Sequence, residues 1–348
     1  MPEDPRNVAT IRDVAHLDDL LSTPDEDVIE ALGRVEGDIL VLGVSGKMGP
    51  TLARMALRGS ELAGVRRRVF GVARFSDEAA ESSLLEHGIE TIRCDLLDPV
   101  ALDRLPDAPN VIFMAGMKFG STGREGMTWA INTHLPGLVA RRFAKSRIVA
   151  FSTGNIYGLT PVARGGSKES DTPSPQGEYA MSCLGRERIF EYFSVSMGIP
   201  TALIRLNYAT EMRYGVLVDL ARKVQAGEPV DLAMGYLNAI WQGDASAQTL
   251  RALEHVESPA CFLNVSGPET LSVREVAGRF GELFDKPVTF RGQEAPEALL
   301  SDTSKARGLF GPPRVGVDRV IEWTADWLGR GGPTSGKPTR FEVIDGRF

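Results

Sequence analysis

Tyr179 and Cys183 are the two residues of this sequence whose side chains and spacing most clearly suggest a chemical role. Their four-residue spacing places both side chains on one face of a helix. A phenol can take a proton from a substrate hydroxyl while hydride leaves the same carbon, but a free tyrosine, with a pKa near ~10, is only ~0.1% phenolate at pH 7. A nearby positive charge would favour the phenolate, whereas Cys183 supplies none and would repel it as a thiolate. Tyr179 could therefore act as a base only if another group supplies the positive charge, which leaves its activation open.

A second candidate site is the loop 43–49, which reads Gly-Val-Ser-Gly-Lys-Met-Gly. It follows the apolar run 39–42 and precedes an expected helix at 50–58. Glycines at such a turn permit a tight bend and let amides at the helix N-terminus reach a pyrophosphate. A nucleoside triphosphate loop is excluded, because Met48 replaces the Ser or Thr that would hold magnesium. The loop predicts a dinucleotide site formed by Gly43, Ser45, Gly46, Lys47, Met48 and Gly49.

The end of the second expected strand bears on the choice of dinucleotide. An acidic residue there would bind the ribose hydroxyls of NAD, but the sequence is Ala73 followed by Arg74. A guanidinium is a good bidentate partner for the 2′-phosphate of NADP, and Lys47 could add a second positive charge. We therefore expect NADP, with NAD as the alternative in which Arg74 is only a solvated residue at the strand end.

Short β-branched runs alternate with longer helical stretches from residue 38 onward, which is typical of a parallel sheet covered on both faces. The expected strands are residues 38–43, 68–73, 90–93, 111–115, 147–151 and 201–206. The predicted fold class is α/β, a doubly wound parallel sheet of the Rossmann type with a smaller C-terminal α/β substrate lobe. The expected domains are an N-terminal extension with a helix (1–36), a dinucleotide-binding domain (37–206, with a strand returning from about 236–265), a substrate-binding lobe (207–330) and a C-terminal tail (331–348).

The extension and the tail carry weaker signals. Thr23, Pro24 and Glu26 have the order of a capping box with a first-turn proline, and they predict one helix. We expect that helix to pack on the dinucleotide-binding domain, with a partner-binding arm as the alternative. In the tail, residues 331–337 are expected to be flexible and residues 341–348 to fold back or to cap a partner.

Bulk composition excludes several classes of partner. The formal net charge of −7 over 348 residues provides no basic field for nucleic acid or for an anionic membrane surface. No apolar run approaches the length needed to cross a bilayer, and the first residues lack the layout of a secretion signal, so we expect a cytoplasmic protein. The three cysteines are widely spaced and the four histidines scattered, which argues against disulfides and against a metal site.

Further motifs follow in a characteristic order: residues 94–98 (Cys-Asp-Leu-Leu-Asp), 114–118 (Met-Ala-Gly-Met-Lys), 151–158 (Phe-Ser-Thr-Gly-Asn-Ile-Tyr-Gly), 205–207 (Arg-Leu-Asn) and 264–269 (Asn-Val-Ser-Gly-Pro-Glu). Over about residues 38–328 this order resembles the extended short-chain dehydrogenase/reductase family, which includes the sugar-nucleotide epimerases and dehydratases. The helix with Tyr179 resembles the Tyr-x-x-x-Lys helix of nicotinamide enzymes, except that Cys183 stands at the lysine position.

The resemblance implies roles for individual residues. The implied catalytic set is Thr153 as the active-site hydroxyl, Tyr179 as base, Lys118 in the loop facing the cofactor, and Asn132 on the family's helix. The implied cofactor contacts outside the glycine loop are Arg74, Asp95, Leu96, Ala115, Gly116, Lys118, Tyr179 and Cys183. The substrate side would be lined by Asn207, together with Arg213, Tyr214 and Trp241, which rest on no motif.

The missing lysine requires a substitute. We expect Lys118 to fill part of its role, while Arg186, two turns beyond Tyr179, is expected to be too far for direct contact. Cys183 is expected to be a small, half-buried thiol packed beside the cofactor, because no histidine lies nearby in sequence to activate it as a nucleophile.

Two functions follow. The first is an NAD(P)-dependent oxidoreductase or epimerase acting on a sugar, sugar acid or nucleotide sugar, with Tyr179 as base and Thr153 orienting the hydroxyl. The second is a dinucleotide-binding sensor or partner protein that lost hydride chemistry with the lysine. The enzyme is favoured because a decayed site need not keep four such residues together: Lys118, Asn132, Thr153 and Tyr179. The family also implies a homodimer formed through the helices that carry Asn132 and Tyr179, and the apolar residues of the second helix agree with it.

Overall fold

A seven-stranded parallel sheet organises the larger part of the molecule in the computed structural model, which describes residues 3–118, 120 and 122–343. Its strands are β1 (Ile39–Leu42), β2 (Val69–Ala73), β3 (Glu90–Arg93), β4 (Asn110–Phe113), β5 (Arg147–Thr153), β7 (Thr201–Leu206) and β12 (Cys261–Val265). The order across the sheet is β12-β7-β5-β4-β1-β2-β3, and every neighbouring pair is parallel. The predicted doubly wound α/β fold is confirmed.

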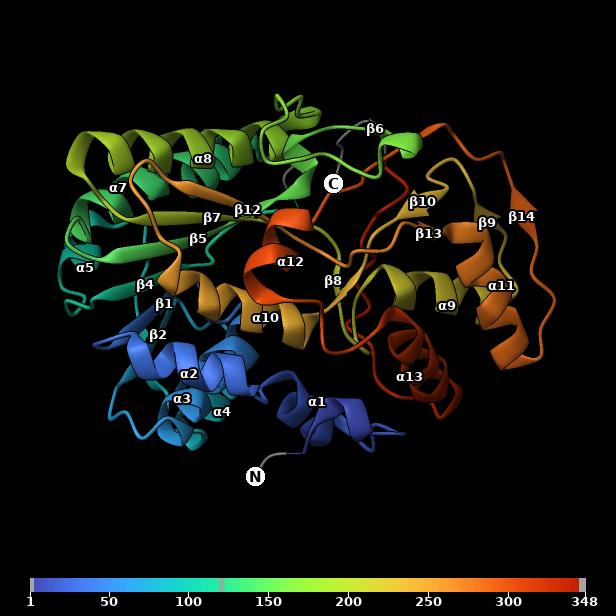
Figure 1. Cartoon of the computed structure of the whole chain (residues 1–348), viewed down its shortest axis with the longest axis horizontal. Coiled ribbons are helices and arrows are strands. Elements are labelled where there is room, and N and C mark those ends of the chain that lie inside the picture. Colours follow the sequence, from blue (N-terminus) through green and yellow to red (C-terminus); the bar gives the residue numbers. More distant parts are fainter. Residues whose placement is uncertain (1–2, 119, 121, 344–348) are drawn as a thin grey trace.

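Helices cover both faces of this sheet (Figure 1). The helices are α1 (Val14–Leu21), α2 (Glu26–Arg34), α3 (Gly49–Leu62), α4 (Glu78–Glu86), α5 (Pro99–Asp103), α6 (Glu125–Trp129), α7 (Leu135–Arg142), α8 (Gly177–Met197), α9 (Val216–Ala226), α10 (Gln242–Arg251), α11 (Val273–Phe284), α12 (Ser304–Phe310) and α13 (Val317–Gly329). One apolar core joins the sheet to α2, α3, α10 and α12, and another joins its opposite face to α5, α7 and α8. The strands of the sheet centre are buried along their whole length, as expected for a sheet covered twice.

The six expected strands lie where the sequence predicts them, with shifts of at most a few residues at their ends. The seventh strand, β12, comes from the returning segment and pairs with β7 at the sheet edge. The chain reverses its direction of winding between β1 and β4, and in open α/β sheets ligands bind at such a point, beyond the carboxyl ends of the strands. The glycine loop after β1 and the motif after β4 both lie there.

A smaller lobe packs beside the sheet and forms the right-hand part of Figure 1. Its core joins α9, α11 and α13 around three deeply buried indoles, Trp241, Trp323 and Trp327. The short strands β6 (Thr160–Pro161), β8 (Ala209–Thr210), β9 (Val230–Asp231), β10 (Tyr236–Leu237), β11 (Ile240–Trp241), β13 (Leu271–Ser272), β14 (Phe290–Arg291) and β15 (Glu297–Ala298) form two-stranded ladders in and beside this lobe. The lobe therefore meets the sheet at the edge that carries the candidate site.

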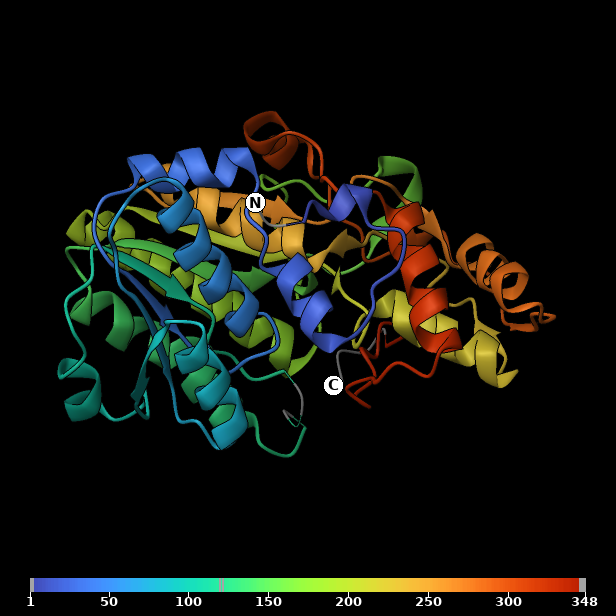
Figure 2. The same ribbon diagram turned by 90° about the horizontal axis from the view of Figure 1, so that it is seen from below.

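The N-terminal extension contains the expected helix, α2, and a second α-helix, α1, that the sequence analysis did not predict. The N-cap of α2 is Asp25, whose carboxylate accepts from the Val28 amide at 2.7 Å, and the capping box predicted around Thr23 is not formed. The short helix α1 had no capping box or proline to announce it. Figure 2 shows α1 beside α3 and the lobe, so the extension packs on the domain as expected.

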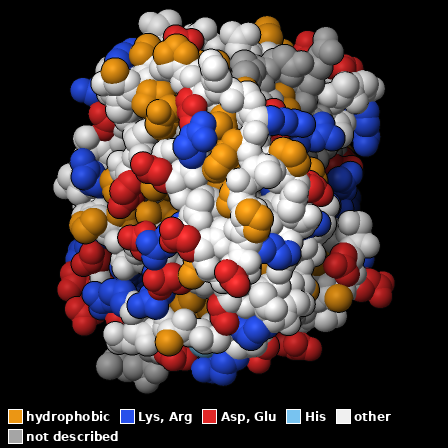
Figure 3. Space-filling model, turned by 90° about the vertical axis from the view of Figure 1, so that its right-hand side faces the viewer, with side chains coloured by type: hydrophobic (Ala, Val, Ile, Leu, Met, Phe, Trp, Pro, Cys, Tyr) orange, Lys and Arg blue, Asp and Glu red, His pale blue; other side chains and the backbone are white. Residues whose placement is uncertain are grey.

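The surface of the lobe carries interspersed acidic and basic side chains on the face shown in Figure 3. This mixed pattern agrees with the absence of a basic field in the sequence. Of the helices in the described ranges, none combines the length and apolar character that a membrane crossing requires.

Candidate functional site

The loop between β1 and α3 brings backbone very close to the neighbouring strand end. Gly43 has φ +88°, and a Cβ there would lie 2.7 Å from the amide nitrogen of Ala115. A Cβ on Gly49 would lie 2.0 Å from the carbonyl oxygen of Val44. Both positions need glycine for steric reasons, and α3 begins directly after the loop, which places the N-terminus of the helix beside it. The helix begins at Gly49, one residue before the expected start.

Two cavities meet at this loop and share Gly43, Gly46 and Met114. The first, of about 240 Å³, is lined by residues predicted to contact the cofactor. Asp95, Leu96 and Arg74 were predicted for its adenosine half, and the others are Ser45, Gly46, Ala115 and Gly116. The second, of about 260 Å³, extends from the loop to Tyr179 and the lobe. A groove with a glycine-rich centre and a chamber on each side fits a dinucleotide whose pyrophosphate lies at the helix N-terminus.

Tyr179 and Thr153 lie together in the second cavity. Thr153 ends β5, and its hydroxyl donates to Asn155 Oδ1 at 3.0 Å. Burial raises the pKa of Tyr179 well above its usual range, and the neighbouring Cys183 raises it further, while Arg186 and a hydrogen bond with Thr153 act in the opposite direction. In this cavity Tyr179 is therefore a neutral phenol at neutral pH.

Cys183 lies directly behind the phenol. Its side chain is 1% exposed and packs with Ile156, Tyr157 and Leu184, so the thiol is more deeply buried than expected. Burial also raises the pKa of the Cys183 thiol above its ordinary value. Cys183 is therefore uncharged at neutral pH and leaves Tyr179 without the cation that a lysine would provide.

Lys118 approaches Tyr179 from the loop after β4. Its Nζ lies 5.8 Å from the centroid of the Tyr179 ring and 3.5 Å from the carbonyl oxygen of Thr339. Desolvation lowers the pKa of Lys118 to about 8, although Cys183 and Asp219 oppose that shift. The structure thus places a cation beside the phenol at neutral pH, where the sequence had predicted it.

Arg186 is a member of the site that the sequence analysis underestimated. Its guanidinium is buried, donates to the carbonyl of Phe151 at 2.7 Å and to Asn132 Oδ1 at 2.8 Å, and lowers the pKa of both Tyr179 and Cys183. A long side chain in a helix points back toward the N-terminus, which shortens the distance implied by seven residues. That direction was the signal available in the sequence.

Asn132 supports the Lys118 loop from behind. Its amide accepts from the Met117 nitrogen at 2.9 Å and donates to the Met117 oxygen at 3.0 Å and to Ser182 at 2.9 Å. It lies in a π-turn (Ala130–His134), is fully buried and lines neither cavity. Its predicted place among the catalytic residues is therefore corrected: among the described atoms it contacts the loop that carries Lys118, and not the phenol.

The expected substrate residues divide into two groups. Asn207 and Tyr214 line the second cavity, and Asn207 also donates to the Leu299 carbonyl at 3.3 Å. Arg213 instead pairs with Asp18 at 2.8 Å and with Glu211 at 3.1 Å. Trp241 is 1% exposed and packs against Trp323 in the lobe core. Arg213 and Trp241 therefore do not line the described cavity, because their side chains turn toward the extension and the core.

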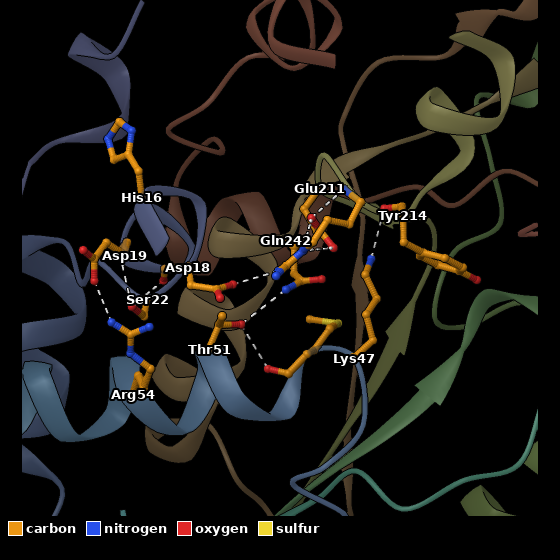
Figure 4. Close-up of polar contacts among 12 residues, drawn as sticks. His16, Asp18, Asp19, Ser22, Lys47, Thr51, Arg54, Glu211, Tyr214 and Gln242 are labelled. Carbon is orange, nitrogen blue, oxygen red and sulfur yellow. Dashed lines mark hydrogen bonds and ion pairs between the residues drawn. The ribbon is translucent and has the colours of Figure 1, made fainter. Parts of the chain in front are cut away.

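Lys47 lies away from Arg74, which corrects its predicted role beside a 2′-phosphate. Its Nζ donates to the carbonyls of Ala209 at 2.9 Å and Tyr214 at 3.3 Å, as Figure 4 shows for Tyr214. Lys47 lines the Tyr179 cavity, whereas Arg74 lines the adenosine cavity. Desolvation lowers the pKa of Lys47 to about 8, an effect that Glu211 opposes.

Ion pairs connect the N-terminal extension to the elements around the Tyr179 cavity. Asp19 pairs with Arg54 of α3 at 2.6 Å, and Asp18 pairs with Arg213 between β8 and α9 (Figure 4). The extension thus links the helix that follows the glycine loop to the loop that lines the substrate side. Sequence reasoning missed this link because both partners are distant along the chain.

Comparisons with known proteins agree with this geometry. A model of the NAD dependent epimerase/dehydratase family matches residues 39–257. None of the curated proteins matches. Among solved structures, the chain is similar to a UDP-glucuronic acid 4-epimerase from Bacillus cereus, in complex with UDP-glucuronic acid and NAD, at 19% identity and a TM-score of 0.70, covering 84% of this chain and 99% of that one.

Similarity to a UDP-glucose 4-epimerase from Thermotoga maritima, solved with UDP-glucose, is comparable: the identity is 17% and the TM-score 0.68, with 84% of this chain and 99% of that chain covered. At such identities the likeness concerns the fold. Because the solved chains are covered almost completely, the remaining sixth of this chain lies outside the shared fold.

Proposed function

Because the chain belongs to the NAD dependent epimerase/dehydratase family, we propose that it is a nicotinamide-dinucleotide-dependent oxidoreductase or epimerase that acts at a hydroxyl of a sugar, sugar acid or nucleotide sugar. The observation that carries the proposal is the cavity in which Tyr179, Thr153 and Lys118 converge at the glycine loop. The family and the solved neighbours, which bind UDP-sugars and NAD, support it. The loss of the lysine at position 183 favours the alternative, a non-catalytic dinucleotide sensor.

The residues divide the chemistry as follows. The glycine loop and the first turn of α3 would hold the pyrophosphate, and Asp95 and Leu96 would hold the adenosine half. When bound, the cofactor supplies a hydride acceptor at the substrate carbon. Thr153 orients the substrate hydroxyl, and the oxygen of Tyr179 takes its proton. The form of Tyr179 that accepts the proton is the phenolate, which the positive charge of Lys118 stabilises before the transfer and which becomes the neutral phenol by it.

For the cofactor, we propose NADP over NAD. Arg74 lines the adenosine cavity, and no acidic residue follows β2 directly at the position where a ribose ligand would stand. The solved neighbour from Bacillus cereus binds NAD, which makes NAD the alternative.

The activity assay is therefore run with NADP and with NAD. Absorbance of the reduced nicotinamide is followed across a panel of sugars, sugar acids and nucleotide sugars. Binding of a dinucleotide with no turnover of any panel member would favour the sensor.

The role of Lys118 makes a prediction about pH. Lys118 is charged below a pH of about 8 and loses its charge above it, so its help to the Tyr179 phenolate is present at pH 7 and lost by pH 9.5. We expect Lys118→Met to lower kcat/KM by roughly 10-fold or more at pH 7 and by much less at pH 9.5. The measurement is the ratio of wild type to variant across this range.

Other dependences of the wild-type to Lys118→Met ratio on pH would point to different roles for Lys118. If the neutral amine of Lys118 were itself the base, the ratio would rise with pH instead of falling. A ratio that stays constant would contradict any role for the charge of Lys118. Lys145, which projects from the exposed surface after α7, provides the matched control through Lys145→Met.

We further propose a homodimer. A groove of about 670 Å³ between α6, α7 and α8 is lined largely by apolar side chains, including Trp129, Leu138, Ile189 and Phe193. Tyr192, next to it on α8, is 63% exposed. A second copy would bury this face in the manner of a helix bundle. Sedimentation should give twice the 37.7 kDa chain mass, and Ile189→Glu should give the monomer; a wild-type monomer at micromolar concentration would exclude the proposal.

The cytoplasmic location expected from the sequence stays a prediction.

A further inference from the structure

The C-terminal segment 333–343 crosses the cleft between the sheet and the lobe. Figures 1 and 2 both show the chain after α13 running back beside the lobe helices. The lobe holds the segment at its start, where Trp327 donates to the Pro333 carbonyl at 3.0 Å and the Ser335 amide donates to the Arg213 carbonyl at 2.9 Å. Residues 341–343 thus fold back as the sequence predicted, and residues 344–348 lie outside the described ranges.

The middle of the segment is anchored more tightly. The amide and hydroxyl of Thr339 both donate to Asp219 Oδ2, at 2.7 and 2.6 Å, and its carbonyl lies 3.5 Å from Lys118 Nζ. Phe341 is 4% exposed and belongs to the core of the lobe, and Glu342 pairs with Lys223 of α9. The segment therefore links the lobe to the catalytic loop through buried and charged contacts.

This placement divides the cleft. Thr339 forms a wall of the Tyr179 cavity of about 260 Å³. Arg340, Phe341 and Val343 reduce the space beyond it to a remnant of about 40 Å³, which shares Lys118 and Asn155 with the first cavity. On the far side, the same three residues line an outer cavity of about 510 Å³. The segment thus contributes to the lining of all three spaces, with Thr339 at the first and Arg340, Phe341 and Val343 at the other two.

Size and charge then restrict the substrate. The Tyr179 cavity lies just below the roughly 300–1,000 Å³ of ordinary small-molecule sites, and it must also receive the nicotinamide end of the cofactor. A cavity of this volume that also receives the nicotinamide end of the cofactor has no room for a nucleoside diphosphate in addition to a sugar. None of the described residues lining the cavity is acidic, whereas Lys47 and Lys118 both reach it. A small anion is the ligand that such a chamber favours.

We propose that residues 333–343 are a specificity-determining wall, which limits the substrate to a free sugar acid of monosaccharide size and excludes nucleotide sugars. The inference rests on the proposed function, and it narrows the substrate classes of that same site to one. It places this chain apart from the two solved neighbours, which are UDP-sugar 4-epimerases.

Calorimetry on the full chain with NADP present tests the wall without relying on turnover. The probes are D-glucuronate, D-glucose, UDP-glucuronate and UDP. We expect D-glucuronate to bind more tightly than D-glucose, and UDP and UDP-glucuronate to show no binding. In Phe341→Ala, which removes the aromatic anchor, UDP should gain more than about 10-fold in affinity, while the matched Phe341→Leu should behave like the wild type.

These titrations test two statements: that residues 333–343 exclude nucleotide sugars, and that the substrate is an acid. Binding of UDP-glucuronate to the wild type as tightly as D-glucuronate would overturn the wall, and so would a folded Phe341→Ala variant without a gain for UDP. If Phe341→Ala does not fold, Glu342→Gln, which weakens the ion pair with Lys223, takes its place with the same expectation. Equal affinity for D-glucuronate and D-glucose would overturn the choice of an acid. Failure of the proposed function itself would appear separately, as absence of turnover in variants that bind these probes.

Discussion

Tyr179→Phe should lower turnover by about 10²- to 10⁴-fold and leave the affinity for the dinucleotide within a few-fold of wild type. The substitution removes one oxygen from the cavity and keeps the ring that packs against Cys183. Because the oxygen is the proposed acceptor of the substrate proton, its loss acts on the chemical step. The measurements are kcat on any substrate identified in the panel and the dissociation constant of the cofactor by calorimetry.

The same variant separates the two functional readings. An enzyme loses turnover and keeps binding, whereas a sensor shows the same binding and no turnover before and after the change. Tyr192→Phe is the matched control, since Tyr192 lies on the same helix, is 63% exposed and lies outside the Tyr179 cavity. If Tyr179→Phe retained most of the wild-type rate, the phenol would not be the proton acceptor.

Local sequence signals were sufficient for the sheet and for the position of the site. Buried parallel strands are short apolar runs, and their order along the chain places the loops after β1, β4 and β5 at one edge. The glycine loop was found from this pattern, whereas Lys118 and Thr153 were implied by the resemblance to the family, and all three line one cavity. The same reasoning could not give the direction of side chains in the irregular segments after β7.

The errors come from contacts that are remote along the chain. Arg213 is turned by Asp18, which lies 195 residues away, and Trp241 is held by Trp323 in the lobe core. Lys47 donates to carbonyls of Ala209 and Tyr214 and therefore points away from the adenosine cavity. For the segment 333–343 the sequence predicted that residues from 341 onward fold back, but Gly, Pro and Ser in a loop cannot show where the loop docks.

Cys183→Lys should raise turnover at neutral pH, by up to about 10³-fold. The pKa of Tyr179 is raised chiefly by burial and next by Cys183, so an ammonium at this position would reverse the second effect and oppose the first. A lowering of that pKa by ~3 units corresponds to about 4 kcal/mol, and the phenolate fraction would rise in proportion. The measurement is kcat/KM between pH 6 and 9, where the rising limb should move to lower pH.

Two local costs reduce this gain and define its controls. Cys183 is 1% exposed, so a lysine must extend its ammonium into the cavity or lower the melting temperature, and like charge from Lys118 and Arg186 opposes it. Cys183→Met adds similar length without charge and should give no increase. A folded Cys183→Lys variant no faster than Cys183→Met would mean that Lys118 already supplies the charge that matters. In that case the double variant with Lys118→Met should restore the advantage of the new lysine, because the two cations would then be alternatives for one role.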